Sequence, residues 1–263
     1  MRLGFIGAGN MAQAMIGGIL AKEIVKKEDI IASAATQKTI DKVAKEFGIN
    51  VTLDNREVAK ADIVFLAVKP FYYEEVIDAI KDVVDEKQLI ISVAAGKSVE
   101  WVENAFGGKK KIVRIMPNTP ALVGEAVTAI CPNTNITDGE KQEIVELIAS
   151  FGLAQIVSEK IMDAVIAVSG SSPAYVFMFI EAMADAAVAE GMPRVQAYQF
   201  AAQSVLGSAK MVLETGKHPG ELKDMVCSPS GTTIEAVKVL EEKGFRSSII
   251  EAMSACADKS RNM

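Results

Sequence analysis

The sequence contains few residues of the kinds that most often build catalytic centres. Its 263 residues include one histidine, His218, and three scattered cysteines, Cys131, Cys227 and Cys256. A single histidine leaves almost no material for catalytic triads, histidine-based metal sites or acid–base pairs. The cysteines lack the spacing of a zinc site or a disulfide framework and fit a reducing cytoplasm. We therefore expect no metal ion, a cytoplasmic protein, and a reaction whose chemistry comes from a cofactor.

The chain also has no excess of positive charge and no long uncharged apolar run. Its 28 Lys and Arg against 34 Asp and Glu give a net charge of −6, which argues against nucleic acid or an anionic membrane as partner. The most apolar segment, 174–192, is interrupted by Glu181, Asp185 and Glu190, so no uncharged stretch reaches the ~18 residues of a membrane span. The first apolar run is too short for a signal peptide.

The clearest positive feature is a glycine-rich turn that directly follows a short apolar run. The turn reads Gly7-Ala8-Gly9-Asn10-Met11-Ala12 and opens an alanine-rich amphipathic stretch. In a strand–loop–helix that holds a dinucleotide pyrophosphate, Gly7 permits the sharp turn and Gly9 lets the backbone approach the phosphates. Ala12 allows close packing of helix on strand, and the first helical amides point at the anion. The turn predicts a dinucleotide site at Gly7, Ala8, Gly9, Asn10 and Met11.

Strand and helix patterns alternate through the first half of the chain. Strands are expected at 3–6, 30–33, 63–68, 89–93, 111–115, 126–131 and 153–157, and helices at 10–22, 38–47, 71–84, 98–106 and 138–150. Strands separated by crossover helices predict a parallel, doubly wound sheet. From residue 159 only helical patterns follow, at 161–169, 174–190, 194–215, 219–226, 232–243 and 245–262. We predict an α/β protein with a Rossmann-like domain at 1–158 and an all-helical dimerisation and substrate-binding domain at 159–263.

The expected helix at 174–190 is apolar around nearly its whole circumference. Such a helix must be buried on all sides, and a domain of about 100 residues is too small to enclose it easily. We therefore expect a homodimer formed through the helical domain. The alternative is a helix that its own domain buries.

The end of the second strand indicates which dinucleotide binds. NAD enzymes of this design carry Asp or Glu there for the ribose 2′-hydroxyl, whereas here Ser33 is followed by Ala34-Ala35-Thr36-Gln37-Lys38. Hydroxyls, an amide and a lysine suit a 2′-phosphate, so we predict NADPH as the preferred cofactor, with NADH also possible. In another interpretation, Ser33 and Thr36 only cap the next helix.

Three further loops follow predicted strands on the side where open α/β sheets bind ligands. They are Ala67-Val68-Lys69-Pro70, Ser92-Val93-Ala94-Ala95-Gly96, and Arg114-Ile115-Met116-Pro117-Asn118-Thr119-Pro120. Lys69 is placed to face the phosphates or the ribose, or else it is a solvated lysine. The small residues Ala94, Ala95 and Gly96 let the flat nicotinamide ring lie close to the backbone.

Two loops of the helical half place hydroxyl residues and glycine just before a helix. They read Ser169-Gly170-Ser171-Ser172-Pro173-Ala174-Tyr175 and Ser228-Pro229-Ser230-Gly231-Thr232-Thr233-Ile234. Free amides at a helix start bind a carboxylate well. The same residues are also ordinary helix-start signals.

These motifs together resemble the Δ1-pyrroline-5-carboxylate reductase family, which makes proline, along essentially the whole chain. The resemblance implies a Rossmann domain, a helical domain that interlocks two subunits, dimers that often assemble into decamers, and NADPH or sometimes NADH as hydride donor. The substrate would be a cyclic imine carrying a carboxylate, and the product L-proline.

The resemblance also implies roles for individual residues. Those lining the cofactor beside the glycine loop would be Ser33, Ala35, Asn55, Ala67, Val68, Lys69, Pro70, Ala94, Ala95 and Gly96. Those binding the substrate would be Ser171, Ser230, Gly231, Thr232 and Thr233. Thr233 is the candidate catalytic residue, as a proton donor to the imine nitrogen. In the plainer interpretation, Asn55 is a turn residue and Thr233 a helix-start hydroxyl.

The chain departs from the family pattern at Ser172 and Ser230, where the family usually has glycine. If those positions require a positive φ, each serine costs about 1–2 kcal/mol. Two other functions stay open. One is a different imine reductase or a β-hydroxyacid-type reductase, for which Lys160 is the candidate catalytic lysine, with no supporting motif around it. The other is a non-catalytic paralogue that binds the cofactor.

Overall fold

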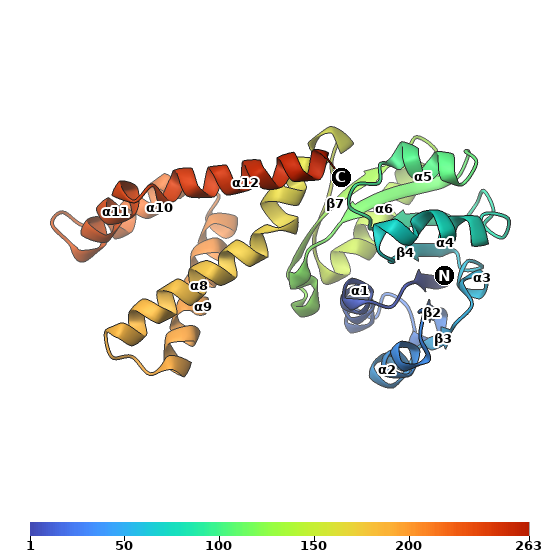
Figure 1. The fold of residues 1–263 in the computed structure, drawn as a ribbon, viewed down its shortest axis with the longest axis horizontal. Helices are drawn as coiled ribbons and strands as arrows, with labels where there is room; N and C mark the ends of the chain where they lie inside the picture. Colours follow the sequence, from blue (N-terminus) through green and yellow to red (C-terminus); the bar gives the residue numbers. More distant parts are fainter. Residues whose placement is uncertain (263) are drawn as a thin grey trace. The chain divides into compact units, whose positions relative to one another are not determined.

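The computed structural model describes residues 1–262 (Figure 1). It contains one eight-stranded sheet in the order β3-β2-β1-β4-β5-β6-β7-β8. The strands are β1 Leu3–Ile6, β2 Ile30–Ser33, β3 Asn50–Thr52, β4 Ile63–Leu66, β5 Leu89–Ser92, β6 Lys111–Met116, β7 Ala126–Pro132 and β8 Gly152–Ile156. The chain divides into two compact units, one of residues 1–171 with the chain from Cys256 onward, and one of Ser172–Ala255.

Helices cover both faces of the sheet in the first unit. They are α1 Asn10–Ala21, α2 Gln37–Phe47, α3 Asn55–Val58, α4 Tyr73–Ile80, α5 Val99–Ala105, α6 Asp138–Ile148 and α7 Met162–Val165. Side chains alternate across the strands, so Phe5 and Phe65 stack on the face packed by α1 and α6 (Figure 1). Their neighbours Ile6 and Leu66 face α4 and α5. Burial on both faces explains the nearly continuous apolar strands.

The predicted doubly wound sheet is confirmed, with one difference in strand direction. Strands β1 to β6 are parallel, whereas β7 pairs antiparallel with β6, and β8 runs parallel to β7. The connection 117–125 contains only a 3₁₀ turn, Thr119–Val123. A parallel crossover needs about a dozen residues or more, so this short connection reverses the chain.

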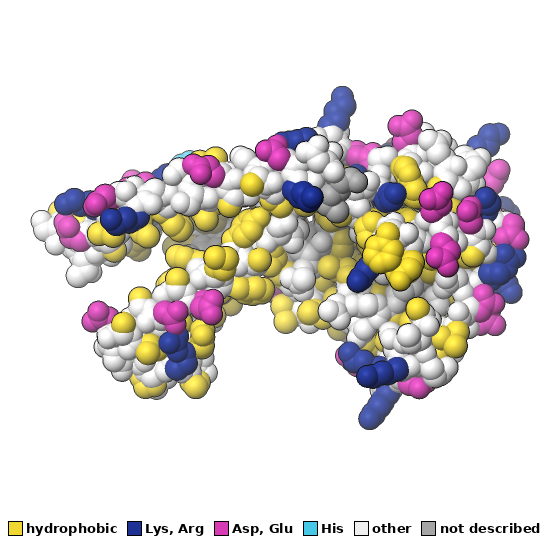
Figure 2. Space-filling view, viewed as in Figure 1, with side chains coloured by type: hydrophobic (Ala, Val, Ile, Leu, Met, Phe, Trp, Pro, Cys, Tyr) yellow, Lys and Arg dark blue, Asp and Glu magenta, His cyan; other side chains and the backbone are white. Residues whose placement is uncertain are grey.

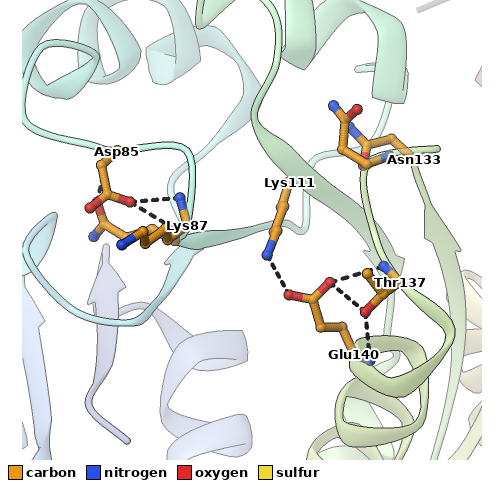
Figure 3. Close-up of polar contacts among 8 residues, drawn as sticks. Asp85, Lys87, Lys111, Asn133, Thr137 and Glu140 are labelled. Atoms are coloured by element: carbon orange, nitrogen blue, oxygen red, sulfur yellow. Dashed lines mark hydrogen bonds and ion pairs between the residues drawn. The ribbon is translucent and has the colours of Figure 1, made fainter.

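Side-chain caps fix where several helices of this unit begin. Thr36 Oγ1 accepts from the Thr39 amide at 3.3 Å, so Thr36 does cap α2. At α6, Thr137 and Glu140 form a capping box, and Glu140 also accepts from Lys111 Nζ at 2.5 Å (Figure 3). The ammonium group and the amide of Thr137 lower the pKa of Glu140 to about 2. The box therefore joins the start of α6 to strand β6.

The second unit consists of helices, and their positions match the sequence-based expectation closely. They are α8 Ser172–Ala189, α9 Arg194–Thr215, α10 Pro219–Val226 and α11 Thr232–Glu242, with α12 Phe245–Arg261 following. Helices α8 and α9 form a hairpin (Figure 1) whose contact includes the buried Ala184, Ala197 and Ala201. Gly191, with φ +95°, makes the turn between them.

Helix α8 is not buried by its own chain. Ala184 is its one buried residue, while Phe177 and Met178 are 62% and 68% exposed. The interpretation that its own domain encloses this helix is therefore wrong. Figure 2 shows hydrophobic side chains along the surface of the helical unit. By length and composition alone, the helical run 159–189 would be apolar enough to cross a membrane.

Candidate functional site

The glycine loop leaves β1 at the carboxyl edge of the parallel strands. Gly7 has φ +98°, and its amide donates to the Ser33 carbonyl at 3.0 Å. A Cβ there would lie 2.6 Å from the carbonyl oxygen of Ala67. Both the backbone angle and the close approach of β4 require glycine. The loop is therefore fixed against the ends of both neighbouring strands.

At Gly9, by contrast, the fold itself does not require glycine. Its φ of −74° suits any residue, and a Cβ would meet no protein atom within 4 Å. Gly9 is the N-cap of α1, which has no side-chain cap and no acidic residue in its first turn. The helix-start amides of Asn10 and Met11 thus adjoin open space, and Ala8 behind them is buried. Uncapped amides beside open space suit a pyrophosphate.

A cavity of 210 Å³ lies beside this loop and brings several predicted cofactor residues together. It is lined by Gly7, Ala34, Ala35, Leu53, Asn55, Val68, Tyr72, Glu75 and Val76. Asn55 Oδ1 accepts a hydrogen bond from Ser33 Oγ at 2.7 Å. Ser33 is fully buried, and its hydroxyl makes this bond and does not cap α2. The pair fixes the Asn55 amide at the end of β2, where a dinucleotide ribose binds in this fold.

Leu53, Tyr72 and Glu75 line the same cavity, and sequence reasoning did not select them. Leu53 lies between β3 and α3, two elements too short to show a periodic pattern. Tyr72 and Glu75 lie in the segment that follows Pro70. The only available signal was that this segment follows a strand end next to the glycine loop.

Lys69 and Pro70 begin the connection from β4 to α4. Pro70 opens a 3₁₀ turn, Pro70–Tyr72, and the Lys69 ammonium lies 5.9 Å from the centre of the Phe71 ring. Lys69 does not line the cavity. Its predicted contact with phosphate or ribose therefore stays a prediction.

Tyr73, which sequence reasoning also missed, ties two of the predicted cofactor loops together. Its buried hydroxyl donates to the Leu66 carbonyl at 2.5 Å and accepts from the Val93 amide at 3.1 Å. Burial raises the pKa of Tyr73 to about 12, so it stays a neutral hydrogen-bond donor. Tyr73 thereby sets the spacing of the loops that start at Ala67 and Ala94. The second loop turns at Gly96, with φ +74°, beyond Ala95.

The third strand-end loop has a structural role in the first unit. Asn118 is buried and bridges the Val127 amide and the Ser169 carbonyl. Buried Arg114 pairs with Glu159 at 2.8 Å, and Glu159 also accepts from the Val99 amide. These bonds anchor the start of the helical half to the sheet.

Ser171, predicted to bind substrate, belongs to the first unit. Its hydroxyl is 3.1 Å from the Cys256 thiol, and its amide donates to the Ile166 carbonyl across a π-helical turn. Ser172 starts α8 and does not have a positive φ. The expected strain at Ser172 is therefore wrong.

The loop before α11, in the second unit, is a tight turn. Gly231 N–H donates to the Ser228 carbonyl at 3.0 Å, with Pro229 and Ser230 between them. Ser230 has φ +58°, the left-handed conformation that favours glycine. The expected strain at Ser230 is therefore confirmed.

Gly231 is the N-cap of α11, and no side chain caps this helix. Thr232 and Thr233 are its first two residues, so their hydroxyls lie beside the helix-start amides. This arrangement suits a carboxylate. Lys160, the lysine of the alternative reductase, is exposed in the 3₁₀ turn Glu159–Ile161.

Comparison with known proteins agrees with this geometry. Residues 159–263 match a family model described as pyrroline-5-carboxylate reductase dimerisation, and residues 2–96 match one described as NADP oxidoreductase, coenzyme F420-dependent. The pyrroline-5-carboxylate reductase of Escherichia coli K12 is 51% identical over 263 residues, covering all of this chain and 98% of the relative. That of Methanosarcina acetivorans is 43% identical, covering 100% and 97%.

A solved structure adds a ligand to the comparison. Plasmodium falciparum pyrroline carboxylate reductase with NADP bound has a TM-score of 0.91 and 34% identity, covering 100% of this chain and 97% of that one. The matched domains describe an NADP-binding oxidoreductase that carries a dimerisation domain. This chain belongs to the pyrroline-5-carboxylate reductase family.

Proposed function

We propose that this chain reduces Δ1-pyrroline-5-carboxylate to L-proline, with NADPH as the preferred hydride donor and NADH as a second one. The observation that carries the proposal is the uncapped start of α1 at Gly9, beside the cavity that holds Asn55. It occurs in a chain 51% identical over its whole length to a relative of that name. No comparable motif supports the alternative reductase built on Lys160.

The residues of the first unit suit the binding of NADPH in an extended form. Amides of the glycine loop would hold the pyrophosphate, Ser33 and Asn55 the ribose, and the loop Ala94–Gly96 the nicotinamide. The bound nicotinamide supplies a hydride to the imine carbon. The chain's own task is to hold the two reactants in contact and exclude water.

The residues at the start of α11 suit the second reactant, the cyclic imine that carries a carboxylate. The Thr232, Thr233 and Ser230 hydroxyls and the amides that follow Gly231 would bind the carboxylate, and a substrate contact of Ser171 stays a prediction. Thr233 would also donate a hydrogen bond to the neutral imine nitrogen and relay one proton from water to it, after which the carbon of the protonated imine accepts the hydride. A protonated imine needs no strong base. This agrees with His218 capping α10, where its Nδ1 accepts from the Gly220 amide at 3.1 Å.

A Thr233→Val substitution tests the role of this hydroxyl. We expect kcat to fall by about tenfold or more, while the Kd for NADPH stays unchanged because none of the proposed NADPH contacts involves Thr233. Thr215→Val, at the end of α9, is the matched control in the helical unit. Turnover equal to that of the control would remove Thr233 from the mechanism.

The assembly and location of the protein are part of the same proposal. We infer a homodimer formed through the helical half, with the domain boundary after residue 158, in the cytoplasm. Nucleic acid and membrane are not partners in this proposal. Further assembly of dimers into a decamer stays a prediction, which light scattering tests directly.

A further inference from the structure

The cavity beside the glycine loop has an unusual charge for a site that takes a 2′-phosphate. Its nine lining residues include no lysine, arginine or histidine, and one carboxylate, that of Glu75. NADP sites of this fold commonly place an arginine near the 2′-phosphate, and NAD sites an acid near the ribose hydroxyls. The charge of this cavity thus resembles that of an NAD site, although the end of β2 carries no acid.

Glu75 reaches the cavity from an element other than β2. It lies in the first turn of α4, whereas Asn55 and Ala35 approach from the ends of β3 and β2. Both Asn55 and Glu75 line the same 210 Å³, so a charge bound in this space shares a small cavity with Glu75. Two negative charges held so close repel appreciably.

The helix dipole alone could account for an acid such as Glu75 in the first turn of α4. Carboxylates there interact favourably with the helix dipole. Glu74, the residue before Glu75, shares that position on α4 and is also exposed. It lines a different depression, with Trp101 and Asp78. The two glutamates therefore share the helix-start effect, and Glu75 alone faces the nucleotide cavity.

We infer that Glu75 sets how strongly this chain discriminates between NADPH and NADH. Its carboxylate lowers the affinity for the 2′-phosphate of NADPH and accepts a hydrogen bond from the free ribose hydroxyl of NADH. Both effects reduce the preference for NADPH and keep NADH usable. This inference rests on the proposed function, because it assumes that the cavity holds the adenosine ribose.

Direct binding of the two cofactors to the full chain tests the inference without relying on turnover. The Kd values of NADPH and NADH are measured by titration calorimetry for the wild type, Glu75→Gln and Glu74→Gln at low ionic strength. We expect Glu75→Gln to raise the ratio Kd(NADH)/Kd(NADPH) about three- to tenfold, with Glu74→Gln leaving it unchanged. Added salt should shrink the part that comes from charge repulsion.

The outcomes separate the inference from the function on which it rests. An unchanged ratio in Glu75→Gln, or an equal loss of affinity for both cofactors, overturns the inference and leaves the proposed function intact. The same rise in Glu74→Gln also overturns it, because the effect would then be general to the helix start. If the wild type binds neither cofactor, the proposed function and the inference both fail.

Discussion

Positions 7 and 9 both lack a side chain, for two different physical reasons. Gly7 has φ +98° and lies against the Ala67 carbonyl, so its lack of a side chain is a requirement of the fold. Gly9 has an unrestricted backbone and open space around its Cα, so its lack of a side chain is explained by a ligand. Substitutions at the two positions should therefore separate stability from binding.

We predict that Gly9→Asp abolishes NADPH binding without unfolding the protein. The added carboxylate fills the space before the α1 amides and repels the pyrophosphate. Calorimetric titration and a thermal melt check both parts. Gly7→Ala is the contrasting variant, and we expect it to lose about 2 kcal/mol or more of unfolding free energy. Retained NADPH affinity in Gly9→Asp would contradict the placement of the pyrophosphate.

Ser230 departs from the family pattern, and its backbone has the strained, positive φ that this departure predicted. With φ +58° at the third position of a turn, serine bears a cost that glycine avoids. We predict that Ser230→Gly raises the unfolding free energy by about 0.5–1 kcal/mol, after the entropy of glycine is subtracted. Chemical denaturation measures this. Ser172→Gly, at the first residue of α8 where φ is not positive, should have the opposite sign, and a stabilising effect there would contradict the explanation.

Element by element, the prediction from sequence was most accurate where a continuous apolar run or clear helix-start and helix-end signals mark the segment. Strand β2 and helices α9 and α10 have the predicted bounds. Strand β3 and helix α3 were missed because they are short and, unlike the four-residue strand β2, contain no continuous apolar run. The antiparallel direction of β7 follows from the short connection 117–125, which leaves no room for the crossover that a parallel strand needs.

In the candidate site, the sequence marks some residues, whereas others are recognised only by their position in the folded sheet. The glycine loop, Ser33 and Val68 were selected because strand ends and a motif mark them in the sequence, whereas Asn55 was selected only through the family resemblance. Tyr73 and Glu75 were not selected, because their roles depend on which strand ends α4 lies beside. That proximity exists only in the folded sheet.

The capping box of α6 gives a prediction about pH. The pKa of Glu140 falls from 4.5 to about 2, because folding places its carboxylate on Lys111 and on the Thr137 amide (Figure 3). A lowered pKa stabilises the folded state above pH 4.5, and this contribution is lost as the pH falls from 4.5 towards 2.

We therefore predict that Glu140→Gln loses about 1–2 kcal/mol of unfolding free energy at pH 7, allowing for partial exposure. The difference from wild type should shrink steadily below pH 4.5. Urea denaturation across this range measures it. Glu143→Gln, on the same helix, is the control. A loss in Glu140→Gln that does not depend on pH would show that the carboxylate charge is not the cause.

For the whole molecule, the helical unit exposes more apolar side chain than a stable monomer normally does. Phe177, Met178 and Phe200 are each more than 60% exposed, within the residues that match the dimerisation model. A second copy of the chain is the partner that explains this surface.

We predict that Phe177→Glu shifts the protein towards monomer, because a charge would be buried in the subunit interface. Light scattering coupled to size-exclusion chromatography measures the mass. Phe71→Glu is the matched control, since Phe71 is 69% exposed on the first unit and should leave the mass unchanged. An unaltered assembly in Phe177→Glu would place the interface elsewhere.

In the proposed reaction, the protein transfers hydride from NADPH to a cyclic imine that carries a carboxylate. The most direct measurement uses NADPH with deuterium at both positions of the nicotinamide C4, together with Δ1-pyrroline-5-carboxylate and the wild-type chain. Mass spectrometry and NMR then locate the label. We predict L-proline with a single deuterium on ring carbon C5. Oxidation of NADPH without labelled proline, or no reaction despite tight NADPH binding, would contradict this hydride transfer.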